Sequence, residues 1–228
     1  MFMFRAKICG IRLKKDVDAV AAAGGDAIGL NFFPKSVRFI EPGSEIARDI
    51  ARSAGELGLL SVGVFVNEPV NEPVNGVDAV ARRLELDAVQ LHGDEPPEAA
   101  AELIGLGHRV IRAIKLPRGP LESSAIDEHC RDWIGLGCHL LLDVDAGAAH
   151  GGSGKTLHWP SLAAWSETHP GLDWTLAGGL APENVAGAIA ESHARSVDTA
   201  SGVECPRGVK NEKRIRGFLD LAIAAMNA

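Results

Sequence analysis

The sequence predicts an α/β protein, a (β/α)8 TIM barrel that forms a single domain over residues 1–228. Three observations predict it. The chain has 228 residues, is 46% hydrophobic and contains no linker or break in composition. It holds eight short apolar runs, and segments with helical periodicity lie between them. Eight strands, each followed by a helix, make such a barrel, whereas a doubly wound open sheet more often stops at about five or six strands.

The apolar runs are expected to form the strands, because parallel strands buried on both faces have nearly continuous hydrophobic sequences. They occupy residues 6–9, 26–32, 59–66, 87–92, 109–115, 138–143, 174–177 and 195–200.

The helices are predicted from apolar residues that recur at spacings of three and four. The clearest sets are Val17, Val20 and Ala21; Val77, Val80, Ala81 and Leu84; and Ile215, Phe218, Leu219 and Ala222. Pro182 suits the first turn of a helix that continues through Glu183, Val185 and Ile189. The duplicated stretch VNEPVNEPVN at 66–75 is rich in proline and asparagine, which predicts a loop.

Composition excludes several classes of function. The net charge is −7 and no basic stripe is present, so no nucleic-acid partner is expected. No apolar run approaches the roughly 18 residues that a membrane helix needs, and the first ten residues are too short and too soon charged for a signal peptide. The four cysteines are scattered, which favours a reduced, cytoplasmic chain. There is no tyrosine, so a tyrosine-based mechanism is excluded. No oligomeric state is predicted.

The glycine-rich stretch GGSGKT at 151–156 resembles a nucleotide-binding P-loop only superficially. A P-loop requires glycine five positions before its last glycine, and Ala149 stands there instead. These glycines instead indicate a backbone that is free to adopt unusual dihedral angles or to lie against a ligand, and a plain flexible loop is the alternative.

Polar residues or glycines follow all eight predicted strands. In a β/α barrel the carboxyl ends of the strands share one face, and active sites form there. This predicted rim consists of Cys9, Asn31, Arg38, Asn67, His92, Lys115, Asp143, Gly178, Gly179, Asp198, Ser201 and Gly202. The last two strands are followed by small residues, and barrels often bind phosphate with these two loops. Gly178, Gly179, Ser201 and Gly202 are therefore expected to bind a phosphate group through freed backbone N–H groups.

Several motifs, in order along residues 7 to about 218, resemble the phosphoribosylanthranilate isomerase family of tryptophan biosynthesis. They are KICGIR (7–12), GLNFFPKSVRFI (29–40), VGVFVN (62–67), VQLHGDE (89–95), LLLD (140–143), LAGGLAPENV (176–185) and VDTASGVECPRGVK (197–210). The resemblance implies a small phosphosugar–anthranilate substrate, N-(5-phosphoribosyl)anthranilate. It undergoes an Amadori rearrangement to 1-(2-carboxyphenylamino)-1-deoxyribulose 5-phosphate, without cofactor or metal.

The resemblance also implies roles for individual residues. Asp143 matches the general acid and Cys9 the general base, so the pKa of Asp143 should be raised by burial or by a nearby negative charge. Arg38 matches the residue that holds the anthranilate carboxylate, and Asp198 a carboxylate that binds sugar hydroxyls.

Three further site predictions follow, two from position in the chain and the last, on the loop at 151–156, from the resemblance. Lys7 lies two residues before Cys9 and so on the same side of the strand, where its ammonium would favour a thiolate. Lys7 is also expected to be one of the substrate-binding residues, together with Arg38, His92 and Asp198. His92 is expected to line the substrate pocket. The glycines of 151–156 are expected to let an active-site loop fold over the site, where Lys155 would face the acid or an anion.

Two alternatives remain. The chain could be another phosphosugar barrel enzyme, an epimerase or an enzyme of the indole-glycerol-phosphate synthase type, for which Lys115 would supply the lysine. It could also be a catalytically silent ligand-binding barrel, against which the intact Cys9 and Asp143 argue.

Overall fold

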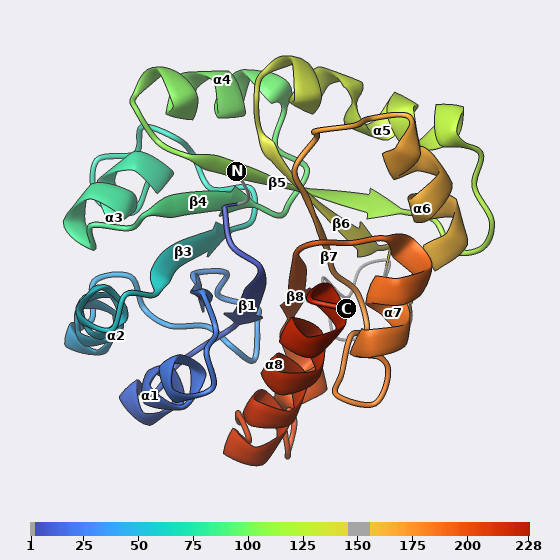
Figure 1. The fold of residues 1–228 in the computed structure, drawn as a ribbon. Coiled ribbons are helices and arrows are strands. Elements are labelled where there is room, and N and C mark those ends of the chain that lie inside the picture. The colour runs from blue at the N-terminus through green and yellow to red at the C-terminus, as the bar shows by residue number, and fades with distance from the viewer. Residues whose placement is uncertain (1–2, 146–155) are drawn as a thin grey trace.

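The structure is a closed barrel of eight parallel strands in sequence order, with the first strand hydrogen-bonded to the last (Figure 1). It is a computed structural model that describes residues 3–145 and 156–228. The strands are β1 (Ala6–Cys9), β2 (Ala27–Asn31), β3 (Leu60–Phe65), β4 (Ala88–Leu91), β5 (Val110–Leu116), β6 (His139–Val144), β7 (Trp174–Leu176) and β8 (Val197–Thr199). The predicted fold class is thus confirmed, and each predicted run agrees with its strand to within two residues at either end.

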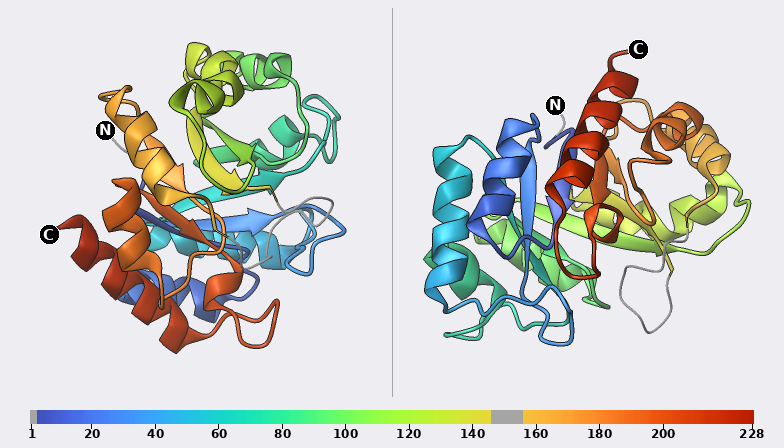
Figure 2. Two further views of the ribbon diagram at one scale, coloured as in Figure 1. Left: turned by 90° about the vertical axis from the view of Figure 1, so that its right-hand side faces the viewer. Right: turned by 90° about the horizontal axis from the view of Figure 1, so that it is seen from below.

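In the part of the chain that the structure describes, eight α-helices cover the outside of the ring of strands. They are α1 (Lys14–Ala22), α2 (Glu45–Glu56), α3 (Val77–Arg83), α4 (Pro97–Gly105), α5 (Ser123–Gly135), α6 (Trp159–Glu167), α7 (Val185–Ser192) and α8 (Glu212–Met226). Figure 2 shows α8 lying beside both α1 and α7, so the last helix closes the outer ring against the first.

Helix ends follow from local chemistry. The Ser44 side chain accepts a hydrogen bond from Ala47 N at the start of α2, and Asn211 does the same for Arg214 N in α8. Each cap satisfies a backbone donor that has no partner within the helix.

The prediction that Pro182 lies in the first turn of a helix was wrong. Helix α7 begins only at Val185, and Pro182 lies in the turn before it. The Asn184 side chain closes this turn, because its Oδ1 accepts from Ala181 N and its Nδ2 donates to Gly179 O. The turn therefore belongs to the loop that leaves β7.

Two hydrophobic layers hold the barrel together. The larger lies between strands and helices, and includes Val17, Val20, Ile215, Phe218 and Leu219. The smaller fills the inside of the barrel and consists of Phe4, Ala27, Val62, Ala88, Ile111, Ala113, Leu141 and Ala177. Most of these inner side chains are small or branched, as a closed eight-stranded ring requires.

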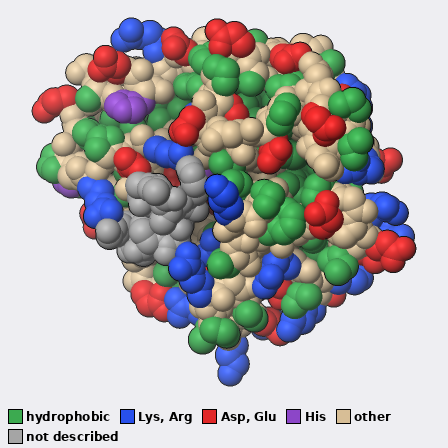
Figure 3. Space-filling view, turned by 180° about the vertical axis from the view of Figure 1, so that it is seen from behind, with side chains coloured by type: hydrophobic (Ala, Val, Ile, Leu, Met, Phe, Trp, Pro, Cys, Tyr) green, Lys and Arg blue, Asp and Glu red, His purple; other side chains and the backbone are tan. Residues whose placement is uncertain are grey.

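The surface carries charges of both signs. Figure 3 shows acidic, basic and hydrophobic side chains interspersed over one face of the molecule. Residues 66–76 connect β3 to α3 without regular secondary structure, as the duplicated stretch predicts. Across residues 3–145 and 156–228, no helix combines the length and the apolar character needed to span a membrane.

Candidate active site

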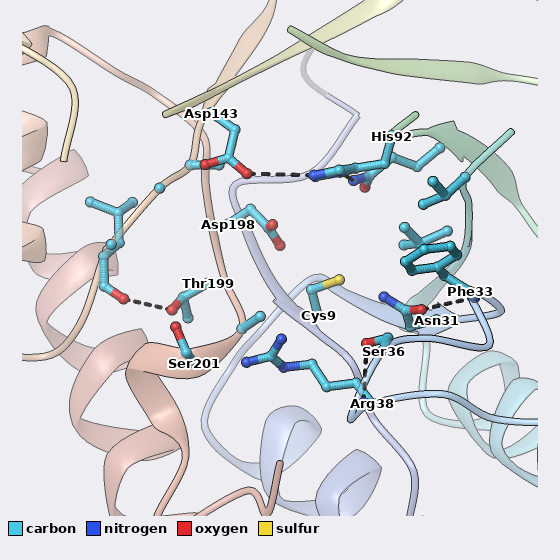
Figure 4. A pocket seen from close by; sticks show the side chains of 18 residues that line it. Cys9, Asn31, Phe33, Ser36, Arg38, His92, Asp143, Asp198, Thr199 and Ser201 are labelled. Carbon is cyan, nitrogen blue, oxygen red and sulfur yellow. Dashed lines mark hydrogen bonds and ion pairs between the residues drawn. The ribbon is translucent and has the colours of Figure 1, made fainter. Parts of the chain in front are cut away.

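A pocket opens at the carboxyl ends of the strands, where the predicted rim places its polar residues (Figure 4). Its lining comprises Cys9, Asn31, Phe33, Ser36, Arg38, Val64, Val66, Gln90, His92, Asp143, Ala177, Gly178, Gly179, Leu180, Asp198, Thr199, Ala200 and Ser201. Cys9 ends β1 and Asp143 lies near the end of β6, so residues 134 positions apart line one cavity.

Cys9 is a buried thiol at the floor of the pocket. Gly29 of the neighbouring strand leaves room for it, because a Cβ built at Gly29 would lie 2.8 Å from the Cys9 Sγ. Burial raises the pKa of Cys9 above its usual value, and Asp198 adds to this effect, although Lys7 opposes it. The expectation that Lys7 favours the thiolate is correct in direction, but burial outweighs it.

Lys7 lies beneath the pocket and is not part of its lining. Its side chain is fully buried, and its Nζ is 2.8 Å from Asp198 Oδ1, close enough for an ion pair but not aligned as a hydrogen bond. Burial alone would lower the pKa of Lys7, but Asp198 and Cys9 together raise it. Lys7 is therefore a buried ammonium that faces the charged groups of the site from below.

Asp143 is a carboxyl group with a strongly perturbed pKa. Burial, with a contribution from Asp198, raises its pKa to about 7, against a hydrogen bond from Val144 N and the charges of Lys115 and Lys7. Near neutral pH this carboxyl is therefore partly protonated, as a general acid must be.

His92 lies beside Asp143 and contacts Gln90 of β4. Its Nδ1 is 2.8 Å from Gln90 Nε2, and its Nε2 is 3.6 Å from Asp143 Oδ2. The imidazole ring therefore lies between the amide of Gln90 and the carboxyl group of Asp143.

Arg38 enters the pocket from the loop after β2 and is almost completely buried. Gly10 makes room for it, since a Cβ built there would lie 2.4 Å from the Arg38 Cδ. The guanidinium already forms two hydrogen bonds with Glu204, from Nε at 2.6 Å and from Nη2 at 2.9 Å. One edge of the guanidinium, formed by Nε and Nη2, is therefore occupied by Glu204.

The loops after β7 and β8 meet at one side of the pocket. Gly178 and Gly179 have positive φ angles of 85° and 64°, and both line the cavity with Ser201. Gly202 does not line it; a Cβ built there would lie 1.9 Å from Leu180 O, so Gly202 lets the two loops pack together. Thr199 Oγ1 strengthens this contact by donating to Leu180 O at 2.6 Å.

A scan of protein families matches residues 6–221 to the family described as N-(5'phosphoribosyl)anthranilate (PRA) isomerase. The chain belongs to this phosphoribosylanthranilate isomerase family. It is thereby an enzyme, an isomerase of tryptophan biosynthesis with a TIM-barrel fold.

Individual members of the family are similar to the chain over nearly its whole length. The N-(5'-phosphoribosyl)anthranilate isomerase of Myxococcus xanthus is 38% identical over 220 residues, which cover 96% of this chain and 95% of the relative. The crystal structure of the Thermotoga maritima isomerase has a TM-score of 0.80 and 35% identity, and covers 97% of this chain and 100% of that one. A further isomerase structure, in complex with reduced 1-(o-carboxyphenylamino)-1-deoxyribulose 5-phosphate, has a TM-score of 0.76 and 33% identity.

Besides Gly202, two residues of the predicted rim, Lys115 and Asn67, lie outside this pocket. Lys115 Nζ is 3.4 Å from Asp94 Oδ1, and Asn67 accepts a hydrogen bond from Asp94 N. Lys115 thus does not line the cavity as the synthase alternative would require. The predicted loop of 151–156 lies outside the described residues except for its last position, and Lys155 is among those left out.

The residues that were not predicted from the sequence include Gln90, which lines the pocket, and Glu204 and Lys210, which lie beside it. Gln90 could have been found, because it lies two residues before His92 and so points to the same side of its strand. Glu204 and Lys210 lie in the resembling stretch 197–210, but their own positions carry no pattern that marks them. Within the described part of the chain, no cluster of three or more His, Cys, Asp or Glu residues has the geometry of a metal site.

Proposed function

We propose that this chain converts N-(5-phosphoribosyl)anthranilate into 1-(2-carboxyphenylamino)-1-deoxyribulose 5-phosphate, with Asp143 as general acid and Cys9 as general base. The observation that carries the proposal is the pairing of these two groups in one cavity, together with a pKa of about 7 for Asp143. General acids work best when their pKa lies near the operating pH.

In the proposed mechanism, Asp143 donates its proton to the ring oxygen of the ribose, and the bond between this oxygen and C1′ breaks. The anthranilate nitrogen supplies the electron pair that forms a C1′=N iminium. The Cys9 thiolate then removes the proton from C2′. The electrons of the C2′–H bond form a C1′=C2′ double bond, and one pair returns to nitrogen. The enolamine gains a proton at C1′ and loses one from the C2′ hydroxyl, which gives the ketone without net oxidation or reduction.

The protonation state of the resting site follows from the two pKa shifts. Burial holds the proton on Cys9 and, up to about pH 7, on Asp143. The reactive state, with Asp143 protonated and Cys9 ionised, is thus a minor form of the free enzyme. Lys7 stabilises it, because its ammonium lies close enough to Cys9 for their charges to interact.

The remaining polar groups are proposed to hold the substrate. Arg38 binds the anthranilate carboxylate with the edge that Glu204 leaves open. Gly178, Gly179 and Ser201 bind the phosphate, and Gly202 maintains their loop. Asp198 and His92 bind the sugar hydroxyls, while Lys7 acts on the substrate only through Asp198 and Cys9.

The experiment is a fluorescence assay that follows loss of phosphoribosylanthranilate with purified protein. Cys9→Ala and Asp143→Asn are each expected to lower kcat by about 100-fold or more, in line with the usual contribution of a general acid or base. The affinity for the reduced product analogue should survive in both variants. Cys130→Ala is the matched control, because Cys130 is a buried thiol in α5 and does not line the pocket. A variant of Cys9 or Asp143 with the wild-type rate would remove that residue from the mechanism.

A further inference from the structure

The carboxylate of Glu204 lies at the centre of a buried cluster beside the pocket. It accepts four hydrogen bonds. Two come from Arg38, one from Lys210 Nζ at 3.0 Å and one from Gly208 N at 2.9 Å. These donors come from the loop after β2 and from the segment between β8 and α8, so Glu204 links two parts of the rim that are far apart in sequence.

The charged side chains of this cluster are almost completely buried. The side chains of Glu204 and Lys210 are each 2% exposed and that of Arg38 is 6% exposed. Burial alone would raise the pKa of Glu204, but its hydrogen bond with Arg38 and the charge of Lys210 lower the pKa to about 2. The cluster thus contains one anion and two cations, and both cations meet at the Glu204 carboxylate.

The geometry decides which donors of Arg38 remain available. A guanidinium has five N–H donors, and Glu204 engages one on Nε and one on Nη2. The free donors are therefore those on Nη1 and the second one on Nη2, which together form the other edge suited to a carboxylate. Figure 4 shows the Arg38 guanidinium reaching into the cavity below Cys9, on the side of Ser201.

Lys210 extends the cluster towards the predicted phosphate site. Besides Glu204, its Nζ donates a hydrogen bond to Ala200 O at 2.7 Å. Ala200 lines the pocket and precedes Ser201 in the chain. The position of Arg38 is thereby tied to the position of the loop after β8.

We propose that Glu204 is a positioning residue that gives the enzyme its preference for a substrate with an aromatic carboxylate, because it fixes the open edge of Arg38 at one place in the pocket. Lys210 supports it by tying Glu204 to the loop after β8. This inference rests on the proposed role of Arg38 in binding the anthranilate carboxylate.

The test compares the binding of two inhibitors. One is the reduced product analogue, 1-(2-carboxyphenylamino)-1-deoxyribitol 5-phosphate, and the other is the same molecule without its carboxyl group. Their inhibition constants are measured for wild type, Glu204→Gln, Glu204→Asp and Arg38→Met. Glu183→Gln is the matched control, because Glu183 forms a similar pair with Arg214 at an exposed position. Wild type should bind the carboxylated inhibitor more tightly, and Arg38→Met should abolish this preference.

Glu204→Gln is expected to reduce the preference about tenfold or more, while affinity for the carboxyl-free inhibitor changes by less than about threefold. Glu204→Asp, which keeps the charge but shortens the reach, should give an intermediate loss and serves as the second variant if Glu204→Gln does not fold. If Glu204 acted only as a counter-charge, its removal would strengthen the attraction of Arg38 for a carboxylate, and the preference would rise.

An unchanged or increased preference in the Glu204 variants, with a lost preference in Arg38→Met, would overturn this inference alone. An equal loss of affinity for both inhibitors would also overturn it and show a purely structural role. A preference retained in Arg38→Met would instead overturn the proposed role of Arg38.

Discussion

The raised pKa of Asp143 implies that this residue destabilises the folded chain at neutral and alkaline pH. An aspartate that binds its proton more tightly when folded than when unfolded adds stability only where the folded form is protonated. As pH rises from 3.8 to about 7, the unfolded chain has already lost the proton that the folded chain still holds. The free energy of unfolding therefore falls over this window and stays low above it.

The size of this effect follows from the pKa in the folded chain. A raised pKa of about 7, compared with 3.8 for an ordinary aspartate, corresponds to about 4 kcal/mol at about 1.4 kcal/mol for each pH unit. In Asp143→Asn this contribution is absent at every pH. The amide oxygen can still accept the 2.7 Å hydrogen bond from Val144 N, so the local backbone contact is retained.

The assay is urea unfolding of wild type and Asp143→Asn at pH 5 and at pH 8. The variant is expected to gain stability relative to wild type between the two pH values, by about 2 to 3 kcal/mol of the full 4 because part of the window lies below pH 5. Groups that titrate equally in both proteins cancel in this difference. If the difference in unfolding free energy between wild type and Asp143→Asn changed by less than about 0.5 kcal/mol from pH 5 to pH 8, Asp143 would have an ordinary pKa. The proposed general acid would then be ionised at neutral pH.

Three further predictions concern the same pair of groups. Gly178→Ala is expected to lower kcat by about 100-fold, because the added Cβ would lie 2.8 Å from Asp143 Oδ1 at a φ of 85°; Gly187→Ala in α7, which meets nothing within 4 Å, should keep full activity. Gly29→Ala should reduce kcat while the reduced product analogue still binds, because its Cβ would displace the Cys9 Sγ; an unchanged kcat would mean that the thiol has room to move. The ratio kcat/KM should rise with pH up to about 7 and then level off. The reason is that the reaction needs a protonated Asp143, whose pKa is about 7, and an ionised Cys9, whose pKa is raised, so that above pH 7 the gain in thiolate is offset by the loss of the Asp143 proton. A decline that starts at pH 7 would show that Cys9 is already ionised there.

The barrel could be predicted from the sequence because its strands are buried on both faces. The run 138–143, for example, is built around three consecutive leucines, and the structure has β6 (His139–Val144) there. The rim was predictable for a related reason: a polar residue after such a run must leave the core. Cys9, His92 and Asp143 were found in this way, and all three line the pocket.

The charge cluster could not be predicted, because it depends on contacts between distant loops. Glu204 and Lys210 look like ordinary surface charges in the sequence, and only the closed ring brings them to Arg38. The protonation state of Cys9 could not be predicted from the sequence either. The alternation of side chains along a strand predicts that Lys7 lies on the same side as Cys9, but it does not predict the burial that raises the pKa of the thiol.

The ion pair between Lys7 and Asp198 joins the first strand to the last, since the two residues are paired in register where β1 meets β8. During synthesis, Lys7 is added to the chain long before Asp198. If the first seven strands closed early, they would enclose an ammonium without its carboxylate, and such an uncompensated charge costs several kcal/mol. Such closure is unfavourable until β8 supplies Asp198, which also lines the pocket. The strand that completes the ring is thus the same strand that completes this side of the pocket.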